Sequence, residues 1–503
     1  MNNKSVFIFL NLFLLSSILI LYGIYKFNFN NVFLFCFVSF CAVFLAFNIG
    51  SNDAANSFGT SVGSKALTLK QALVVCAIFE ISGVLFAGNK VVETIRDKII
   101  IFPDSISPVL FVCIMLSALL SSGIWILLAT KKGLPISATH CIIGGLVGAS
   151  IMMCVIEYDK IQTFNIVKWQ YIGLITLSWA IVPFLSCILA YFLYAFVVKN
   201  IIVPIKRKER LLRILKEKKR IIQSKYISDA AQRVDAYLNL ELDSINKNDD
   251  FQIFIDKIKA RKKVININKN LKFIPYFVCS GLVVNLGIFL LEGVKYENFY
   301  HFLTNLWILI VVVSIFYFIL TSYLSIFSKT KITKVVKKIF IIFQIIGACC
   351  FAFAHGSNDI ANVLAPFLAI LDVLKDGDID TGFNPSFFLF VILGIALISG
   401  FFFLGREVIN TVGNKIISIN PVSGFCIEVS AGAIILLFSQ AGVPISSTHV
   451  LIGAILGVGL QVKRINWNLL KVIIMTWLIT LPTVSLLSTF IFLILRMILM
   501  ETF

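Results

Sequence analysis

The feature that most constrains the fold of this chain is a succession of apolar runs, each long enough to cross a lipid bilayer. Hydrophobic residues make up 59% and charged residues only 14% of its 503 residues, whereas soluble domains are about a quarter charged. The runs lie at roughly 5–25, 32–49, 69–88, 108–130, 134–156, 169–198, 273–293, 302–327, 339–355, 386–405, 424–441, 445–460 and 469–496. We therefore expect an all-α polytopic membrane protein with about 12 to 13 transmembrane helices.

The positive charge is concentrated in one polar segment between two hydrophobic halves. The net charge is +18, and residues 199–272 contain 20 lysines and arginines against 9 acidic residues. Short basic loops such as Lys131–Lys132 and Lys463–Arg464 occur elsewhere. Because basic loops stay in the cytoplasm, we interpret 199–272 as a cytoplasmic linker near anionic headgroups and not as a nucleic-acid-binding domain.

Two heptapeptides, Gly50–Asn56 and Gly356–Asn362, match at six of seven positions. Each places one aspartate and two asparagines inside a long apolar stretch. Charged and amide side chains are costly in hydrocarbon, and those found there usually face a protein interior or an aqueous path for a substrate or ion. The duplication therefore predicts a transporter.

Two further blocks recur in the same order as the heptapeptides. The stretches 81–100 and 398–417 agree at ten positions, and Gly133–His140 reappears as Gly442–His449. Residues 32–198 and 339–496 are thus one unit used twice, an arrangement common in secondary transporters.

The basic loops and the number of crossings indicate that the two repeats are inverted relative to each other. We expect 134–156 to cross the membrane fully, although a re-entrant hairpin is the alternative. The first run lacks a signal-peptide cleavage site and is interpreted as a membrane span. The expected segments are an N-terminal span (1–31), the first repeat (32–198), the linker (199–272), two connecting spans (273–327) and the second repeat (328–503).

The third duplicated block predicts two helix starts inside the membrane. Pro135 and Pro444 precede serine and threonine residues and then an apolar run. Proline favours the first helical turn, and Ser and Thr cap helix N-termini. A helix that begins at mid-membrane exposes unpaired N–H groups and the positive end of its dipole, so two converging starts would form an anion site.

The duplicated aspartates, Asp53 and Asp359, have a matching role. An anion beside two carboxylates requires cations, and carboxylate and amide oxygens suit both Na⁺ and protons. Asn56 and Asn362 follow three residues later, on the same face of a helix. Coupling between anion and cation would follow from this pairing of charges.

Taken together, the Gly-x-Asn-Asp-x-Ala-Asn and Pro-x-Ser-x-Thr-His motifs resemble those of the inorganic phosphate transporter (PiT) family, across both repeats. The resemblance implies a phosphate permease or phosphate:cation symporter coupled to Na⁺ or H⁺, with broken helices at the substrate site. It places the cation-coupling centre at Asp53, Asn56, Asp359 and Asn362, and the phosphate site at Asn52, Ser137, Thr139, Asn358, Ser446, Ser447 and Thr448.

Two glutamates also match family members, without a carboxylate at the equivalent place in the other repeat. These are Glu80 and Glu428, and Leu397 aligns with Glu80. A structural hydrogen bond and a direct role in coupling are both open for them.

Several alternatives are weighed against this interpretation. A sulfate or other oxyanion permease would use the same motifs, and a passive anion channel would lack accumulation. An intramembrane aspartyl protease also needs two membrane aspartates, but the Gly-x-Gly-Asp motif is absent, so we expect no enzyme. No organic cofactor and no resident metal are expected. We expect a cell-membrane protein in contact with the bilayer; Na⁺ or H⁺ coupling, and a homodimer or a monomer, stay open.

Overall fold

The computed structural model is helical throughout the part of the chain that it describes. That part comprises residues 3–27, 29, 31–87, 89–97, 106–157, 168–237, 253, 256–258, 260, 275, 279, 307–315, 317–319, 321–322, 332–377 and 387–500. The expected span 273–293 lies outside it except at 275 and 279, and 302–327 is described in part. Nine helices of the described residues are long and apolar enough to cross a membrane. The prediction of an all-α polytopic membrane protein is confirmed.

The chain divides into two compact units. Unit 1 comprises Met1–Tyr194, Leu282–Leu309 and Phe340–Phe503, and unit 2 comprises Ala195–Gly281 and Ile310–Ile339. All three duplicated blocks belong to unit 1.

The helices of the first repeat follow an N-terminal helix, α1. Their bounds are α1 Asn3–Lys26, α2 Val32–Gly63, α3 Leu69–Ala87, α4 Asn89–Asp97, α5 Pro108–Lys131, α6 Ala138–Glu157 and α8 Trp169–Val197. The second repeat comprises α14 Ile332–Asp359, α15 Ala361–Asp376, α16 Phe387–Leu404, α17 Arg406–Asn410, the π-helix η2 Thr411–Lys415, α18 Pro421–Gln440, α19 Ser447–Val462 and α20 Trp467–Met500.

The two repeats interleave, because helices of one pack on helices of the other. A Cβ atom at Gly50 of α2 would lie 1.8 Å from the Leu397 carbonyl oxygen of α16, so the helices touch where glycine leaves room. Helix α14 of the second repeat packs in the same way on α3 of the first repeat. There a Cβ atom at Gly356 would lie 2.2 Å from the Glu80 carbonyl oxygen. Close backbone contact through small residues is typical of membrane helices.

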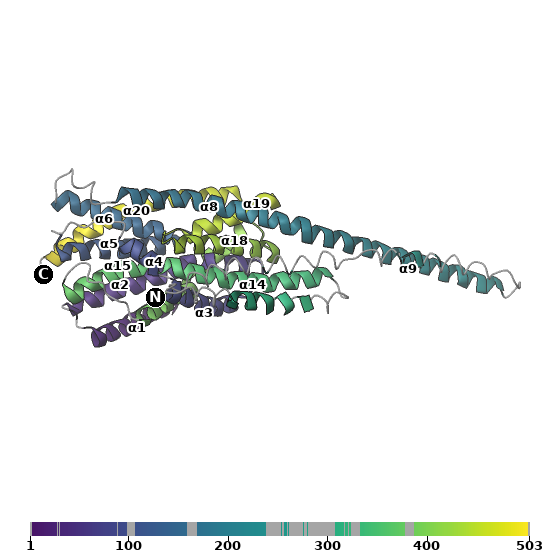
Figure 1. The fold of residues 1–503 in the computed structure, drawn as a ribbon, viewed down its shortest axis with the longest axis horizontal. Coiled ribbons are helices and arrows are strands. Elements are labelled where there is room, and N and C mark those ends of the chain that lie inside the picture. The colour runs from purple at the N-terminus through teal and green to yellow at the C-terminus, as the bar shows by residue number, and fades with distance from the viewer. Residues whose placement is uncertain are drawn as a thin grey trace. The chain divides into compact units, whose positions relative to one another are not determined.

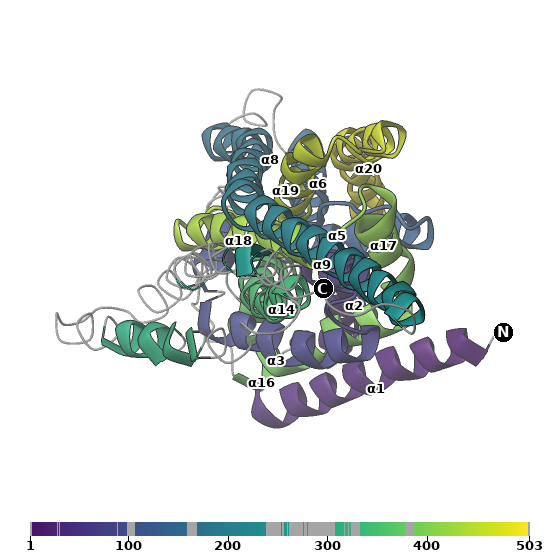
Figure 2. The ribbon, with the colours of Figure 1, turned by 90° about the vertical axis from the view of Figure 1, so that its right-hand side faces the viewer.

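Helices α6 and α19 begin beside each other inside unit 1 and extend in opposite directions (Figure 1). They lie on one side of the unit with α8 and α20, whereas α1 and α3 lie on the other (Figure 2). The turn before α6 contacts Asn52, which lies well inside α2 and not at its end. Helix α6 is among the nine helices that are long and apolar enough to cross a membrane, so the full crossing expected for 134–156 stays a prediction.

The two heptapeptides differ in local structure. Helix α2 runs unbroken through the first one, whereas α14 ends at Asp359 and α15 begins at Ala361 after the single residue Ile360. Pro366 of α15 stands where the first repeat has Thr60. Proline cannot donate a hydrogen bond to the carbonyl four residues earlier, so the first turn of α15 is less firmly joined than the same turn of α2.

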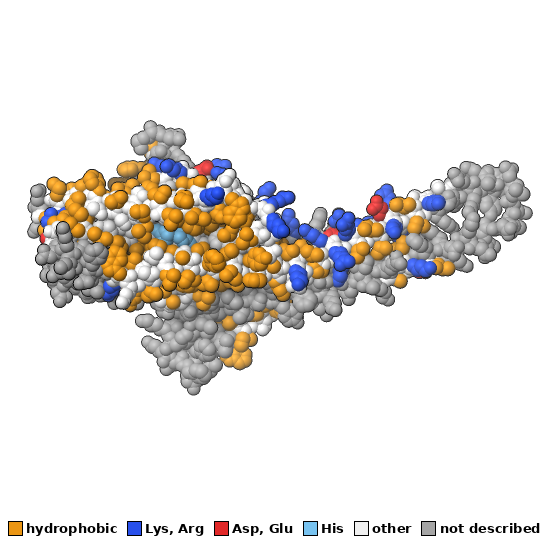
Figure 3. Space-filling model, turned by 90° about the horizontal axis from the view of Figure 1, so that it is seen from above, with side chains coloured by type: hydrophobic (Ala, Val, Ile, Leu, Met, Phe, Trp, Pro, Cys, Tyr) orange, Lys and Arg blue, Asp and Glu red, His pale blue; other side chains and the backbone are white. Residues whose placement is uncertain are grey.

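The surface of unit 1 over α8 and α20 is covered with hydrophobic side chains (Figure 3). Phe184, Leu478 and Leu486 are 72%, 65% and 73% exposed, as expected for side chains that contact lipid.

Unit 2 contains the longest polar helix of the described residues. This helix, α9 Val203–Tyr237, follows the π-helix η1 Val198–Ile202, and basic side chains lie along it (Figure 3).

Candidate substrate and cation site

The starts of α6 and α19 are tied together by two crossed hydrogen bonds. Thr139 Oγ1 donates to the Ile445 carbonyl oxygen at 3.0 Å, and Thr448 Oγ1 is 2.9 Å from the Ile136 carbonyl oxygen. Each threonine of one repeat therefore contacts the loop that precedes the helix of the other. The paired helix starts predicted from the Pro-x-Ser-x-Thr-His blocks meet in this way.

Serine caps leave the first turn of each helix with free N–H groups. The hydroxyls of Ser137 and Ser446 accept from the N–H groups three residues later, both at 3.2 Å. The next N–H groups inward bond to the carbonyls of the same two serines. Within the described residues no hydrogen-bond acceptor is paired with the main-chain N–H groups of Ala138, Thr139, Ser447 and Thr448. Because the helices run apart from adjacent starts, these donors converge.

The two motif asparagines hold the loops before these helices. Asn52 Nδ2 donates to the Leu134 carbonyl oxygen at 3.0 Å, and its Oδ1 accepts from the Ile136 N–H at 2.9 Å. Asn358 Nδ2 donates to the Ile445 carbonyl oxygen at 2.8 Å. Both amides lie beside the helix starts, where the resemblance placed phosphate ligands, and both position the backbone there.

Asp53 lies against α19. Its Oδ1 accepts from Asn56 Nδ2 at 2.7 Å and is 3.1 Å from Thr448 Oγ1. Asn56 Nδ2 also lies 2.9 Å from Thr448 Oγ1 and 3.3 Å from Ser447 Oγ. The aspartate and asparagine of the first repeat thus contact the helix start of the second.

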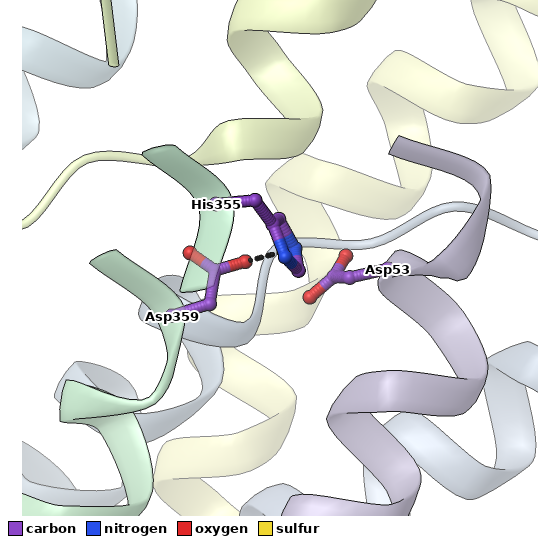
Figure 4. A group of neighbouring side chains, drawn as sticks. All are labelled: Asp53, His355 and Asp359. Carbon is purple, nitrogen blue, oxygen red and sulfur yellow. Dashed lines mark ion pairs between the residues drawn. The ribbon is translucent and has the colours of Figure 1, made fainter. Parts of the chain in front are cut away.

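Both carboxylate oxygens of Asp359 make polar contacts. Its Oδ1 accepts from Asn358 Nδ2 at 2.6 Å, and its Oδ2 accepts from Ser447 Oγ at 2.7 Å. His355 Nε2 lies 2.8 Å from the same Oδ2. Figure 4 shows His355 between the two aspartates, and the closest oxygen and nitrogen atoms of the three side chains lie within 4.8 Å of one another.

His355 is the residue of this cluster that the sequence analysis did not select. Its Nδ1 lies 3.1 Å from Glu80 Oε1, so the imidazole bridges Glu80 and Asp359. A neutral imidazole carries one N–H, and two carboxylate contacts therefore require one additional proton on the triad. Ile49 occupies the equivalent position in the first repeat, so His355 has no symmetric counterpart and the duplication of motifs does not point to it.

The two glutamates occupy separate places along α2. Glu80 Oε1 accepts from Ser57 Oγ at 2.5 Å and faces His355, so Glu80 belongs to the cluster. Glu428 lies one turn further along, where its Oε1 accepts from Thr60 Oγ1 and, at 2.6 Å, from Ser61 Oγ. Both glutamates are buried.

Two buried amides of the duplicated motifs have polar atoms without a hydrogen-bond partner within the described residues. Asn56 Oδ1 and both side-chain polar atoms of Asn362 have no hydrogen-bond partner. An unsatisfied buried polar group is costly, and carboxylate and amide oxygens are the donor set of hard cations. Oxygen atoms of this kind are present at Asp53, Asp359 and Asn56 within the cluster, and Asn362 has an open amide oxygen as well.

Comparison with known proteins supports the same interpretation. A profile of the phosphate transporter family matches residues 49–488. A Mycobacterium bovis protein assigned as a phosphate permease is 37% identical over 468 residues, covering 89% of this chain and 84% of that protein. A Thermococcus kodakarensis protein with the same assignment is 32% identical over 457 residues, covering 90% and 96%.

A solved structure described as the sodium-dependent phosphate transporter aligns with a TM-score of 0.71 and 27% identity, over 91% of this chain and 98% of that one. These relatives are transporters, which confirms the expected class and excludes the protease alternative. The chain belongs to the phosphate transporter family.

Proposed function

We propose that this protein is a secondary transporter that moves inorganic phosphate across a membrane together with a cation. The observation that carries the proposal is the meeting of two helix starts, with free N–H groups, beside a buried pair of aspartates. No lysine or arginine is among the buried residues of the described part. Such a site offers an anion donors but no fixed charge, so its charge balance depends on cations.

The anion is assigned to the first turns of α6 and α19. Main-chain N–H groups at helix starts bind oxyanions, and the helix dipoles add favourable potential. Ser137 and Ser446 fix these turns as caps. Thr139, Ser447 and Thr448 lie in the first turns themselves, and Asn52 and Asn358 position the loops before them.

The cation is assigned to Asp53, Asn56, Asp359 and Asn362, and we take it to be Na⁺. Open amide oxygens at Asn56 and Asn362 support a metal cation, because a proton needs only one acceptor. The sodium dependence in the description of the solved relative points the same way. Glu80 is assigned to the coupling centre through His355. Glu428, which lies one turn further along α2, is assigned to cation coupling as a second buried carboxylate.

Coupling follows from electrostatics. Two unit charges 4 Å apart interact by about 4 kcal/mol at an effective dielectric constant of about 20. Phosphate beside two carboxylates is therefore strongly disfavoured until cations enter. Binding of either ion lowers the cost of binding the other, and the loaded site approaches neutrality.

The proposal includes a location and an orientation. The protein is placed in the cell membrane, with the basic linker 199–272 in the cytoplasm by the positive-inside rule. A cysteine at Ser224 of α9, which is exposed, should react with a membrane-impermeant thiol reagent in inside-out vesicles only. Labelling in right-side-out vesicles instead would reverse the orientation.

The function is tested by uptake into proteoliposomes. Radiolabelled phosphate should accumulate above its equilibrium level when an inward Na⁺ gradient is imposed, and the accumulation should collapse when that gradient is dissipated. A proton gradient without Na⁺ provides the arm for H⁺ coupling, and protein-free vesicles provide the background. Equilibration without accumulation under every gradient would contradict the proposal and favour a channel.

A further inference from the structure

One face of helix α9 carries a stripe of exposed side chains in which apolar and basic residues are interspersed. The stripe comprises Val203, Arg207, Leu211, Ile214, Lys218, Ile221 and Lys225, and all seven side chains are exposed. They follow one another at intervals of three or four residues and therefore share one face of the helix. The apolar side chains of Ile214 and Ile221 are 42% and 59% exposed, so apolar surface lies open beside positive charge along α9 (Figure 3).

The positive charge of α9 is concentrated in the part that follows the membrane helix. Residues 203–225 contain ten lysines and arginines against two glutamates, whereas 226–237 contain one arginine against two aspartates. Helix α8 continues into η1, and η1 into α9, without an intervening loop. The basic stretch therefore begins directly after the apolar run of α8, where the chain leaves the hydrocarbon core. A partner at this boundary matches the distribution of charge better than one that binds the whole helix.

A stripe of this composition is complementary to an anionic lipid surface. Apolar side chains of a surface helix enter the boundary between headgroups and acyl chains, and its basic side chains remain at the headgroups. Anionic lipids attract basic segments that lie next to a membrane helix. We propose that the stripe of α9 binds the anionic phospholipid headgroups of the membrane in which the protein is inserted. This interaction is independent of the transported substrate.

A second copy of α9 is less well matched to the same stripe. From Arg207 onwards the spacing is also that of a coiled coil, in which apolar residues fill the contact positions. Two copies paired in parallel would place Arg207, Lys218 and Lys225 opposite their own equivalents. Like charges in contact oppose such a pair, whereas the same charges favour an anionic surface.

The proposal is tested on the full chain in vesicles by the position of a fluorescent label. An environment-sensitive fluorophore is attached in the variant Leu211→Cys, on the stripe, or in Lys216→Cys, which is exposed on the opposite face. The unmodified protein treated with the same reagent gives the background from the native cysteines. The vesicles contain phosphatidylcholine alone or with phosphatidylglycerol, and a lipid with a nitroxide near the headgroup quenches a label that enters the membrane.

In vesicles with phosphatidylglycerol the label of Leu211→Cys should be strongly quenched, and that of Lys216→Cys should not. In phosphatidylcholine alone both labels should stay unquenched. Addition of 1 M KCl should release the first label, because the Debye length falls to about 3 Å. Equal quenching of both labels, or quenching that does not require phosphatidylglycerol, would overturn the proposal. Shielding of the Leu211→Cys label that follows protein concentration and not lipid composition would overturn it in favour of a second copy.

A matched pair of triple variants, each combined with Leu211→Cys, assigns the binding to one face. The stripe variant carries Arg207→Gln, Lys218→Gln and Lys225→Gln, and the control variant carries Arg213→Gln, Lys216→Gln and Arg220→Gln. Each lysine or arginine near an anionic surface contributes about fivefold to binding. The stripe variant should therefore lower the ratio of lipid-bound to free α9 roughly 100-fold, and the control variant much less. An equal loss in both variants would show that only net charge matters and would refute the assignment to the stripe.

Discussion

The pseudo-symmetric threonines provide a sharp test of how the site is built. Thr139 and Thr448 both contact a loop carbonyl of the other repeat, at 3.0 and 2.9 Å. Thr448 Oγ1 additionally lies 3.1 Å from the Asp53 carboxylate and 2.9 Å from Asn56 Nδ2. Valine has a similar shape to threonine but no hydroxyl, so Thr139→Val removes the contact with the carbonyl alone, whereas Thr448→Val also removes those with the cation centre.

The magnitude follows from the kind of contact that is lost. A hydrogen bond between neutral groups contributes about 1 kcal/mol, and one to a charged group about 1.5–3 kcal/mol. Thr139→Val should therefore weaken Na⁺-dependent phosphate binding about fivefold, and Thr448→Val roughly 10- to 150-fold. Binding is measured by phosphate titration at saturating and at limiting Na⁺. In the Thr448→Val variant, phosphate affinity should also depend less strongly on the Na⁺ concentration.

Thermal unfolding in detergent serves as the control for this pair. The Ile445 carbonyl keeps its hydrogen bond from Asn358 when Thr139 is replaced, and both variants should remain folded. Equal effects of the two substitutions on phosphate affinity would refute the link between Thr448 and Asp53.

Three other perturbations test other parts of the molecule. Gly50→Ala should strongly lower the unfolding temperature, because its Cβ would lie 1.8 Å from a carbonyl oxygen of α16, whereas Gly173→Ala, with nothing within 4 Å, should not; equal shifts would contradict the packing. The variant His355→Ile introduces the residue that the first repeat has at this position. It should abolish phosphate accumulation and lower the free energy of unfolding by about 3–5 kcal/mol, as expected for breaking a buried pair. Retained accumulation would show that His355 is not part of the coupling centre. Glu428→Gln keeps an acceptor for Ser61 but loses the charge, so half-maximal uptake should require more Na⁺, and an unchanged Na⁺ titration would make Glu428 a structural group.

The repeated motifs predicted the fold and the meeting of the helix starts, because both follow from patterns within the chain. Asp53 and Asp359 converge as expected from inverted repeats. The contacts of Asn52 were not predictable in the same way. Its amide is complementary to the loop at Leu134 and Ile136, and this loop becomes its neighbour only after α5 and α6 fold as a hairpin. Periodicity and composition do not encode such a long-range contact.

The asymmetric residues of the site explain why two similar repeats perform different tasks. Ile49 and His355 occupy equivalent positions, and because of this single difference Asp359 has a histidine 2.8 Å from its carboxylate, whereas the residue four positions before Asp53 is apolar. Two identical carboxylates facing one anion would repel it equally and would offer it the same contacts. With histidine beside only one carboxylate, the two aspartates present different contacts to the ions of the site. The duplicated fold thus provides the geometry of the site, and the departures from its symmetry determine the chemistry.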